Sequence, residues 1–223
     1  MQVINYDDLL LPQNIGIIRH SIKNDGLLIY PTDTLYGLGS NFFSLPAMAK
    51  IDRIKGRYDL PYSVAVSGPQ MLEQLVETIP NIFYELAEKL LPGKFTFLLK
   101  ASGALDQQLL KNSDKIGIRI PAVPNLLKLI ELLNTPLIST SVNHSGKLPL
   151  NDPAAIQKFF SSSPIQDSSL VFINKGILPP SRGSTILDLT VSPIHCIRRG
   201  DDFNILKELS IDFKFTEATK IGK

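Results

Sequence analysis

Short apolar runs alternate with longer amphipathic stretches along most of this chain, and that alternation limits the fold more than any other feature. The apolar runs are strand-sized and rich in Val, Ile and Phe, and they lie at residues 27–32, 63–67, 95–101, 116–120, 137–141, 170–173, 185–189 and 194–198. Helix-like stretches fall between several of them, at residues 46–55, 69–77, 81–90, 125–133 and 153–160. Strands and helices interleaved in this way predict an α/β fold.

The last predicted strands follow one another with little helix between them. Parallel neighbours need a long crossover connection, so antiparallel pairs are expected in this part of the chain. The expected fold class is therefore α/β, with a mixed sheet of parallel and antiparallel strands flanked by helices. Residues 161–169 and 175–183 are rich in turn-forming residues and are predicted to be loops.

The composition is that of one globular domain. Of the 223 residues, 43% are hydrophobic and 20% are charged, and nothing divides the chain into dissimilar halves, so a single domain over residues 1–223 is expected. The apolar runs are far shorter than the roughly 20 residues of a membrane-spanning helix, and the first residues lack the pattern of a secretory signal. A single cysteine, Cys196, suits a reducing compartment. We therefore expect a cytoplasmic protein that does not associate with a membrane.

The formal net charge is only +2, so an anion has to be bound by a local cluster of cations. Lys55 and Arg57 form such a cluster at the end of a predicted helix, which Gly56 should terminate because glycine readily adopts the left-handed conformation. With the helix broken between them, both cations can turn toward one anion, and a triphosphate fits that need. The alternative, which these residues alone favour, is that the basic residues complement the negative end of the helix dipole.

A second polar cluster begins inside the predicted strand at residues 137–141. Residues two apart on a strand share a face, so Ser139, Ser141 and Asn143 would form one polar row at the end of a buried strand. Ligands of α/β sheets commonly bind at strand ends. A hydrogen-bonded turn explains the same Ser and Asn residues equally well.

Arg119 lies in a predicted strand whose isoleucines occupy the opposite face. Its guanidinium can bind a carboxylate in bidentate fashion there, or it can be a solvated charge on an exposed face. The segment 30–41 concentrates hydroxyls and glycines after a strand, which predicts either a tight turn or a loop that approaches a small polar ligand. The segment is not a GxGxxG fingerprint, and no GxxxxGK(S/T) phosphate loop occurs in the sequence.

The histidines and the cysteine do not indicate a metal site. His20, His144 and His195 are scattered, and neither HExxH nor paired-Cys spacing occurs. Cys196 lies in a strand-like run and is interpreted as a small buried hydrophobe.

Seven short motifs in register resemble the YrdC family of threonylcarbamoyl-AMP synthases. They are YPTDTLYGLG (30–39), KGR (55–57), LPGKFT (91–96), GIRIP (117–121), SVN (141–143), STILD (184–188) and RRG (198–200). Their order and spacing match over about residues 10–202, which leaves a short C-terminal extension at residues 203–223. The resemblance is to the stand-alone form, without the further C-terminal domain of longer members. It implies a single domain with a twisted mixed sheet and a concave basic cavity.

The resemblance also implies an enzyme. It would be a nucleotidyltransferase that makes L-threonylcarbamoyladenylate and pyrophosphate from L-threonine, bicarbonate and ATP, with Mg²⁺ accompanying the ATP. The product would serve the modification of the adenosine next to the anticodon of tRNA, through a downstream threonylcarbamoyl-transferase complex. Direct contact with tRNA or double-stranded RNA is a further candidate interaction.

The resemblance assigns the site residues to two groups. Residues expected to bind ATP are Lys55, Arg57, Ser141, Asn143 and Arg198, and the first two are the expected catalytic residues. Residues expected around threonine are Thr34, Arg119, Ser139 and Ser184. The chemistry agrees, because the carbamate of threonine is a weak nucleophile that must meet the α-phosphate in line, and positioned cations stabilise the charge that builds there.

Three positions depart from the family pattern. Tyr58 follows the basic motif where the family usually has proline, and the link from there to Pro61 is one residue short. Ala65 and Lys115 stand where some members place a histidine and a threonine beside the substrates. Two other functions remain open: a non-catalytic module that binds double-stranded RNA or tRNA, and a YciO-like paralogue with another substrate. The intact basic pair argues against the YciO-like branch, in which that motif is altered.

Overall fold

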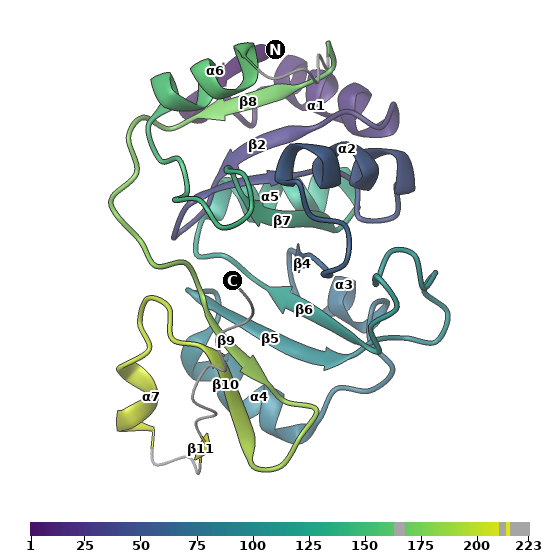
Figure 1. Ribbon diagram of the computed structural model, residues 1–223, viewed down its shortest axis with the longest axis vertical. Coiled ribbons are helices and arrows are strands. Elements are labelled where there is room, and N and C mark those ends of the chain that lie inside the picture. The colour runs from purple at the N-terminus through teal and green to yellow at the C-terminus, as the bar shows by residue number, and fades with distance from the viewer. Residues whose placement is uncertain (163–167, 210–212, 215–223) are drawn as a thin grey trace.

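The computed structural model describes residues 1–162, 168–209 and 213–214, whose strands form one mixed sheet (Figure 1). The strand order is β1-β8-β2-β3-β7-β4-β6-β5-β9-β10-β11. The strands are β1 (Gln2–Asn5), β2 (Leu28–Pro31), β3 (Tyr36–Gly39), β4 (Ser63–Ala65), β5 (Phe95–Lys100), β6 (Lys115–Arg119), β7 (Leu137–Ser141), β8 (Val171–Asn174), β9 (Thr185–Asp188), β10 (Ile194–Arg198) and β11 (Phe213–Lys214). Strand β8 pairs with β1 and β2 in parallel, whereas β3 pairs with β2 and β7 in antiparallel. The predicted mixed α/β sheet is therefore confirmed.

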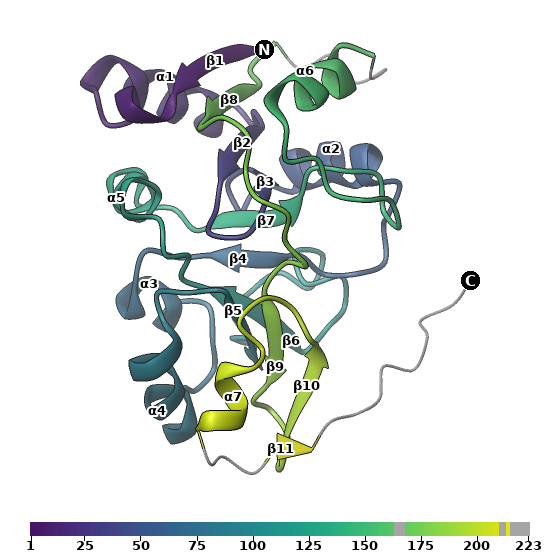
Figure 2. The same cartoon turned by 90° about the vertical axis from the view of Figure 1, so that its left-hand side faces the viewer.

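Helices cover the sheet on both sides. They are the 3-10 helix η1 (Tyr6–Asp8), α1 (Pro12–Lys23), α2 (Leu45–Lys55), α3 (Pro69–Glu73), α4 (Asn81–Leu90), α5 (Pro124–Leu133), α6 (Pro153–Ser161) and α7 (Ile205–Glu208). Figure 2 shows α1, α3, α4 and α5 on one side of the stacked strands and α2 and α6 on the other. No helix in the described ranges is long and apolar enough to cross a bilayer.

The ends of two predicted helices follow the expected chemistry. Ser44 caps α2 by accepting a hydrogen bond from the backbone N–H of Ala47 at 3.0 Å. Gly56 ends the same helix in the left-handed conformation, with φ of 60°, as its sequence position predicts. Asp152 caps α6 through the N–H of Ala154.

Each strand predicted from the apolar runs is confirmed to within two residues, and the expected antiparallel pair late in the chain is that of β9 with β10. The helix predicted at residues 69–77 is too long, because it ends at Glu73 and Val76 then pairs with Ala101 as an isolated bridge. The helix α1 and the edge strand β1 were not predicted. Residues 163–167 of the predicted loop 161–169 and most of the predicted extension 203–223 lie outside the described residues.

The segment 30–41 differs from the turn or loop expected for it, because residues 36–39 form the central strand β3. Its glycines are what allow the pairing. A Cβ on Gly39 would lie 1.9 Å from the carbonyl oxygen of Ile138 on β7, and one on Gly37 would lie 2.9 Å from the ring of Tyr30 on β2. Gly37 and Gly39 therefore allow the neighbouring strands to approach closely, and only residues 32–35 form the turn.

Candidate functional site

A cavity of about 310 Å³ lies among the central strands, bordered by β3, β7, β6 and β9 and by the last residue of α2. All nine residues predicted for the site line it, although they come from separate elements: Thr34, Lys55, Arg57, Arg119, Ser139, Ser141, Asn143, Ser184 and Arg198. Arg182 adds a fifth cation to the lining, and none of the described residues that line the cavity is Asp or Glu. The cavity is thus suited to an anionic ligand.

Lys55 is held at the end of α2 by the strand end opposite. Its Nζ donates to the carbonyl oxygen of Ser141 at 2.8 Å and to Oδ1 of Asn143. Oδ1 of Asn143 also accepts from the Ser141 hydroxyl at 2.6 Å. The ammonium is only 3% exposed, and burial, followed by the charge of Arg57, lowers the pKa of Lys55 from 10.5 to about 8. Lys55 lines the cavity, so an anion bound there would stabilise its buried ammonium.

The residues after β7 close the C-terminus of α2. The N–H of Ser145 donates to the carbonyl oxygen of Lys55 at 2.8 Å, and Nδ1 of His144 donates to that of Ile54 at 2.8 Å. The predicted hydrogen-bonded turn is therefore present, and Ser139, Ser141 and Asn143 also line the cavity. The turn satisfies helix carbonyls that would otherwise lack partners.

Arg57 lies just beyond the helix end, with its guanidinium 4.7 Å from the centre of the Tyr62 ring. Its Nε is buried and has no hydrogen-bond partner among the described residues. A buried donor without a partner is costly, so an acceptor from a ligand would lower the energy of the site.

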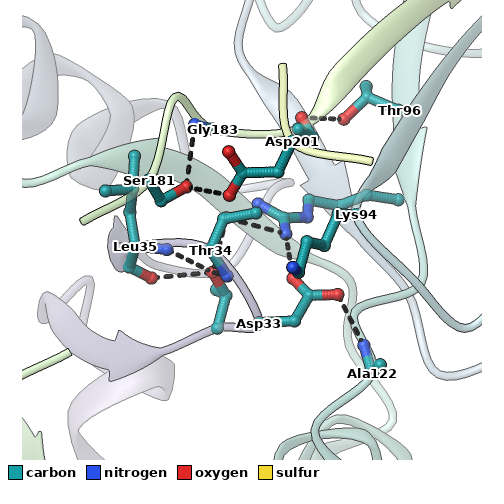
Figure 3. A network of polar contacts seen from close by, with 12 residues as sticks. Asp33, Thr34, Leu35, Lys94, Thr96, Ala122, Ser181, Gly183 and Asp201 are labelled. Carbon is teal, nitrogen blue, oxygen red and sulfur yellow. Dashed lines mark hydrogen bonds and ion pairs between the residues drawn. The ribbon is translucent and has the colours of Figure 1, made fainter. Parts of the chain in front are cut away.

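Arg119 is not a solvated surface charge, because it is only 7% exposed and forms an ion pair with Asp33. Its Nη2 donates to Oδ1 of Asp33 at 2.7 Å, with Thr34 Oγ1 at 3.4 Å. The other oxygen of Asp33 accepts from the N–H of Ala122 at 2.8 Å, and Figure 3 shows the carboxylate reaching toward Ala122. Nε of Arg119 is buried and has no hydrogen-bond partner in the described part of the chain, and the residue lines the cavity.

A third hydrogen-bonded group joins β5, β9 and β10. Arg198 donates from Nε and Nη2 to the carbonyl and the hydroxyl of Ser184, at 2.9 and 3.0 Å. The Ser184 hydroxyl also contacts that of Thr96 at 2.8 Å. These contacts fix Arg198 and Ser184 on the same wall of the cavity.

Several residues at the site were missed from the sequence. Asp33, which accepts a hydrogen bond from Arg119, lies in the segment 30–41. The hydroxyls and glycines of this segment gave the prediction of a ligand loop, and its acid did not. Arg182 lies in the predicted loop 175–183, where a single exposed arginine gave no signal. Asp201 anchors the loop by accepting from the Ser181 hydroxyl at 2.6 Å (Figure 3). It also accepts from the Arg182 N–H at 3.0 Å.

The three departures from the family pattern do not fall on the cavity wall. Tyr58 is 63% exposed, and Ala65 is completely buried in β4. Lys115 forms an ion pair with Asp188 at 2.8 Å. None of the three is among the residues that line the cavity. Cys196 is 3% exposed, which confirms that it is a buried residue of the core.

The mixed sheet and the cation-lined cavity define an α/β domain whose cavity is suited to an anionic ligand. A family model for Sua5, YciO and YrdC proteins, described as "Telomere recombination", matches residues 20–200. The chain belongs to the Sua5/YciO/YrdC family. This confirms the resemblance drawn from the seven motifs.

Known members of the family are similar over most of this chain. A threonylcarbamoyl-AMP synthase of Pyrococcus abyssi (strain GE5 / Orsay) is 30% identical over 199 residues, which cover 89% of this chain and 57% of the relative. The crystal structure of P. abyssi Sua5 complexed with L-threonine matches with a TM-score of 0.86 at 27% identity, covering 97% of this chain and 63% of that one. The crystal structure of E. coli YciO matches with a TM-score of 0.78 at 26% identity, covering 90% and 95%. This chain thus spans less than two thirds of the Pyrococcus proteins and nearly all of YciO.

Proposed function

We propose that this protein is a threonylcarbamoyl-AMP synthase, which forms L-threonylcarbamoyladenylate and pyrophosphate from L-threonine, bicarbonate and ATP. The name of the Pyrococcus relative and the threonine bound to a similar structure support this activity. The observation that carries the proposal is that Arg57 and Arg119 both line one cavity and each keeps a buried Nε without a partner among the described residues. Two such arginines suit two anions, a polyphosphate and an amino-acid carboxylate.

Lys55 and Arg57 would bind the phosphates. Lys55 offers an ammonium already oriented by Ser141 and Asn143, so little reorganisation is needed when phosphate arrives. Arg57 offers the planar guanidinium that matches phosphate oxygens. Arg198, fixed by Ser184, would add a further contact to the nucleotide. Together these cations would stabilise the charge that builds on the phosphate oxygens as pyrophosphate leaves.

Arg119 would bind the carboxylate of threonine through its guanidinium, since this residue lines the cavity. Thr34, Ser139 and Ser184 line the same cavity, and their hydroxyls would bind the polar groups of the amino acid. The carbamate formed from the amine and bicarbonate then attacks the α-phosphate in line, the new P–O bond forms, and the bond to pyrophosphate breaks. Holding both substrates in one cavity is the main contribution of the protein to this step.

The lining residues do not fit a magnesium ion held by protein carboxylates. The described residues contain no group of three or more His, Cys, Asp or Glu that could hold a metal ion, and the cavity wall carries no acid. Mg²⁺ commonly binds through phosphate oxygens and waters. We therefore propose that it arrives on the ATP, and we assign no step of the reaction to it.

The product would pass to a threonylcarbamoyl-transferase complex that modifies tRNA in the cytoplasm. A YciO-like activity on another substrate is the second candidate, since YciO matches this chain over nearly its whole length. The two differ in their substrate, because the synthase requires threonine and bicarbonate for pyrophosphate release. Tight, salt-dependent binding of RNA without nucleotide turnover would instead favour the RNA-binding alternative.

The test is release of pyrophosphate from ATP, measured with and without threonine and with and without bicarbonate. Release that depends on both substrates is expected, and release that ignores either one contradicts the proposal. Arg57→Ala should lower kcat/KM at least about 100-fold, the scale seen when a positioned transition-state donor is removed. Arg53→Ala is the matched control, because Arg53 is an exposed arginine in the last turn of α2, four residues before Arg57.

A further inference from the structure

A buried tyrosine lies directly under the guanidinium of Arg57. Tyr62 is 3% exposed, and the Arg57 guanidinium carbon lies 4.7 Å from the centre of its ring. The described residues give Arg57 no ion pair, and its Nε has no hydrogen-bond partner. The ring is therefore the main contact that holds the head of this side chain.

Tyr62 is itself fixed from behind by a buried acid. Its hydroxyl donates to Oδ1 of Asp52 at 2.8 Å, and Asp52 is 5% exposed. The second oxygen of Asp52 accepts from Nζ of Lys111, and the carbonyl oxygen of Asp52 accepts from the Arg57 N–H at 3.1 Å. Burial and then the bond to Asp52 raise the pKa of Tyr62, so the phenol keeps its proton. This bond fixes the position of the ring's hydroxyl end.

An aromatic ring holds an arginine without using its hydrogen-bond donors. A carboxylate partner would occupy N–H groups of the guanidinium, as Asp33 accepts from Nη2 of Arg119. A cation over an aromatic ring is attracted by the π face, so this contact does not require a carboxylate to occupy the N–H groups of the guanidinium. Donation of the Tyr62 proton to Asp52 also makes the ring more electron-rich, which strengthens its attraction for the cation.

We propose that Tyr62, braced by Asp52, is a positioning residue that directs the guanidinium of Arg57 toward the phosphates of the nucleotide. This inference rests on the proposed function in taking Arg57 as a phosphate ligand. Tyr62 contacts the arginine through its ring and also lines the cavity, so a double-mutant cycle distinguishes action through Arg57 from direct contact with the ligand. The face of the ring, rather than the hydroxyl or the volume of the side chain, is the part that matters most for binding.

The experiment measures the Kd of ATP and the Kd of L-threonine by calorimetry for a set of variants. Tyr62→Leu removes the ring face and should weaken ATP binding about tenfold. Tyr62→Phe keeps the face and should stay within about threefold of the unsubstituted protein. Threonine binding should not change in either variant, because Arg119 has its own support from Asp33. Tyr84→Leu is the matched control, since Tyr84 is 52% exposed on α4.

A double-mutant cycle with Arg57→Ala makes the test specific. If the ring acts through Arg57, Tyr62→Leu should weaken ATP binding no further once Arg57 is absent. Equal losses for Leu and Phe, additive losses in the cycle, or parallel losses of ATP and threonine binding would each overturn the positioning role. If Tyr62→Leu does not fold, Tyr62→Met carries the same expectation, because it fills space without a π face.

The outcomes also separate this inference from the proposed function. If the unsubstituted protein binds ATP but releases no pyrophosphate with threonine and bicarbonate, the proposed activity fails while the binding data still decide the role of Tyr62. If it binds no ATP at all, both are overturned.

Discussion

Replacement of Asp33 by alanine should destabilise the whole protein, because it leaves a buried arginine without its counter-charge. The carboxylate accepts from Arg119 Nη2 at 2.7 Å and from the Ala122 N–H at 2.8 Å. The side chains of Arg119 and Asp33 are 9% and 6% exposed, so water can replace little of what is lost. Removing one partner of a buried ion pair costs about 3–5 kcal/mol. We expect a loss at the lower end of that range, because Arg119 borders a cavity and water can reach part of it.

The loss should be measured by urea unfolding followed by far-UV circular dichroism, since the chain has no tryptophan to report by fluorescence. Linear extrapolation gives the free energy of unfolding of each variant. Asp33→Asn keeps an acceptor oxygen and should lose only about 2 kcal/mol. Asp114→Ala, at an exposed aspartate, should change the free energy by less than about 0.5 kcal/mol. A loss below about 1 kcal/mol for Asp33→Ala would show that the pair is solvated like a surface pair, and the reasoning would be wrong.

Three further outcomes follow from the site and the sheet. ATP affinity should fall as the pH rises through about 8, by up to about tenfold per pH unit, because Lys55 then loses the proton that attracts phosphate. The free energy of unfolding should rise between about pH 8 and 10.5, where the unfolded chain binds one more proton than the folded chain. Titration calorimetry and urea unfolding across that range check both signs. Asn143→Ala should cost about 1–3 kcal/mol of unfolding free energy because it removes an acceptor of the buried Lys55 ammonium, and an unchanged urea midpoint would contradict this. Gly39→Ala should cost about 3 kcal/mol or prevent folding, since its Cβ would meet the Ile138 carbonyl oxygen, whereas Gly16→Ala, in an open helix position, should raise the melting temperature slightly.

The strands of this fold could be predicted because most are short, continuous apolar runs bounded by breaking residues. The strand β3 was missed for the opposite reason, since the two glycines of Tyr36–Gly39 indicate a turn in isolation. Their real function depends on Tyr30 and Ile138, which belong to two other strands. Local patterns cannot show such contacts.

The members of the site could be named from the sequence, but their arrangement could not. The break at Gly56 predicted that Lys55 and Arg57 can face one anion, and both line the cavity. The contact between Asp33 and Arg119 joins residues that are 86 positions apart, and β7 and β4 lie between β3 and β6 in the order of strands. That order is set by packing of the whole chain, so the acid that supports Arg119 was visible only in the structure.

The cavity wall takes residues from Thr32 near the beginning of the chain to Arg198 in β10. During synthesis, therefore, no partial chain can present the complete wall until β10 has emerged and paired with β9. Contacts between residues so distant in sequence also form slowly. The complete cavity wall therefore forms only after β10 has been synthesised. Retention on an immobilised ligand would consequently select fully folded chains from incomplete ones.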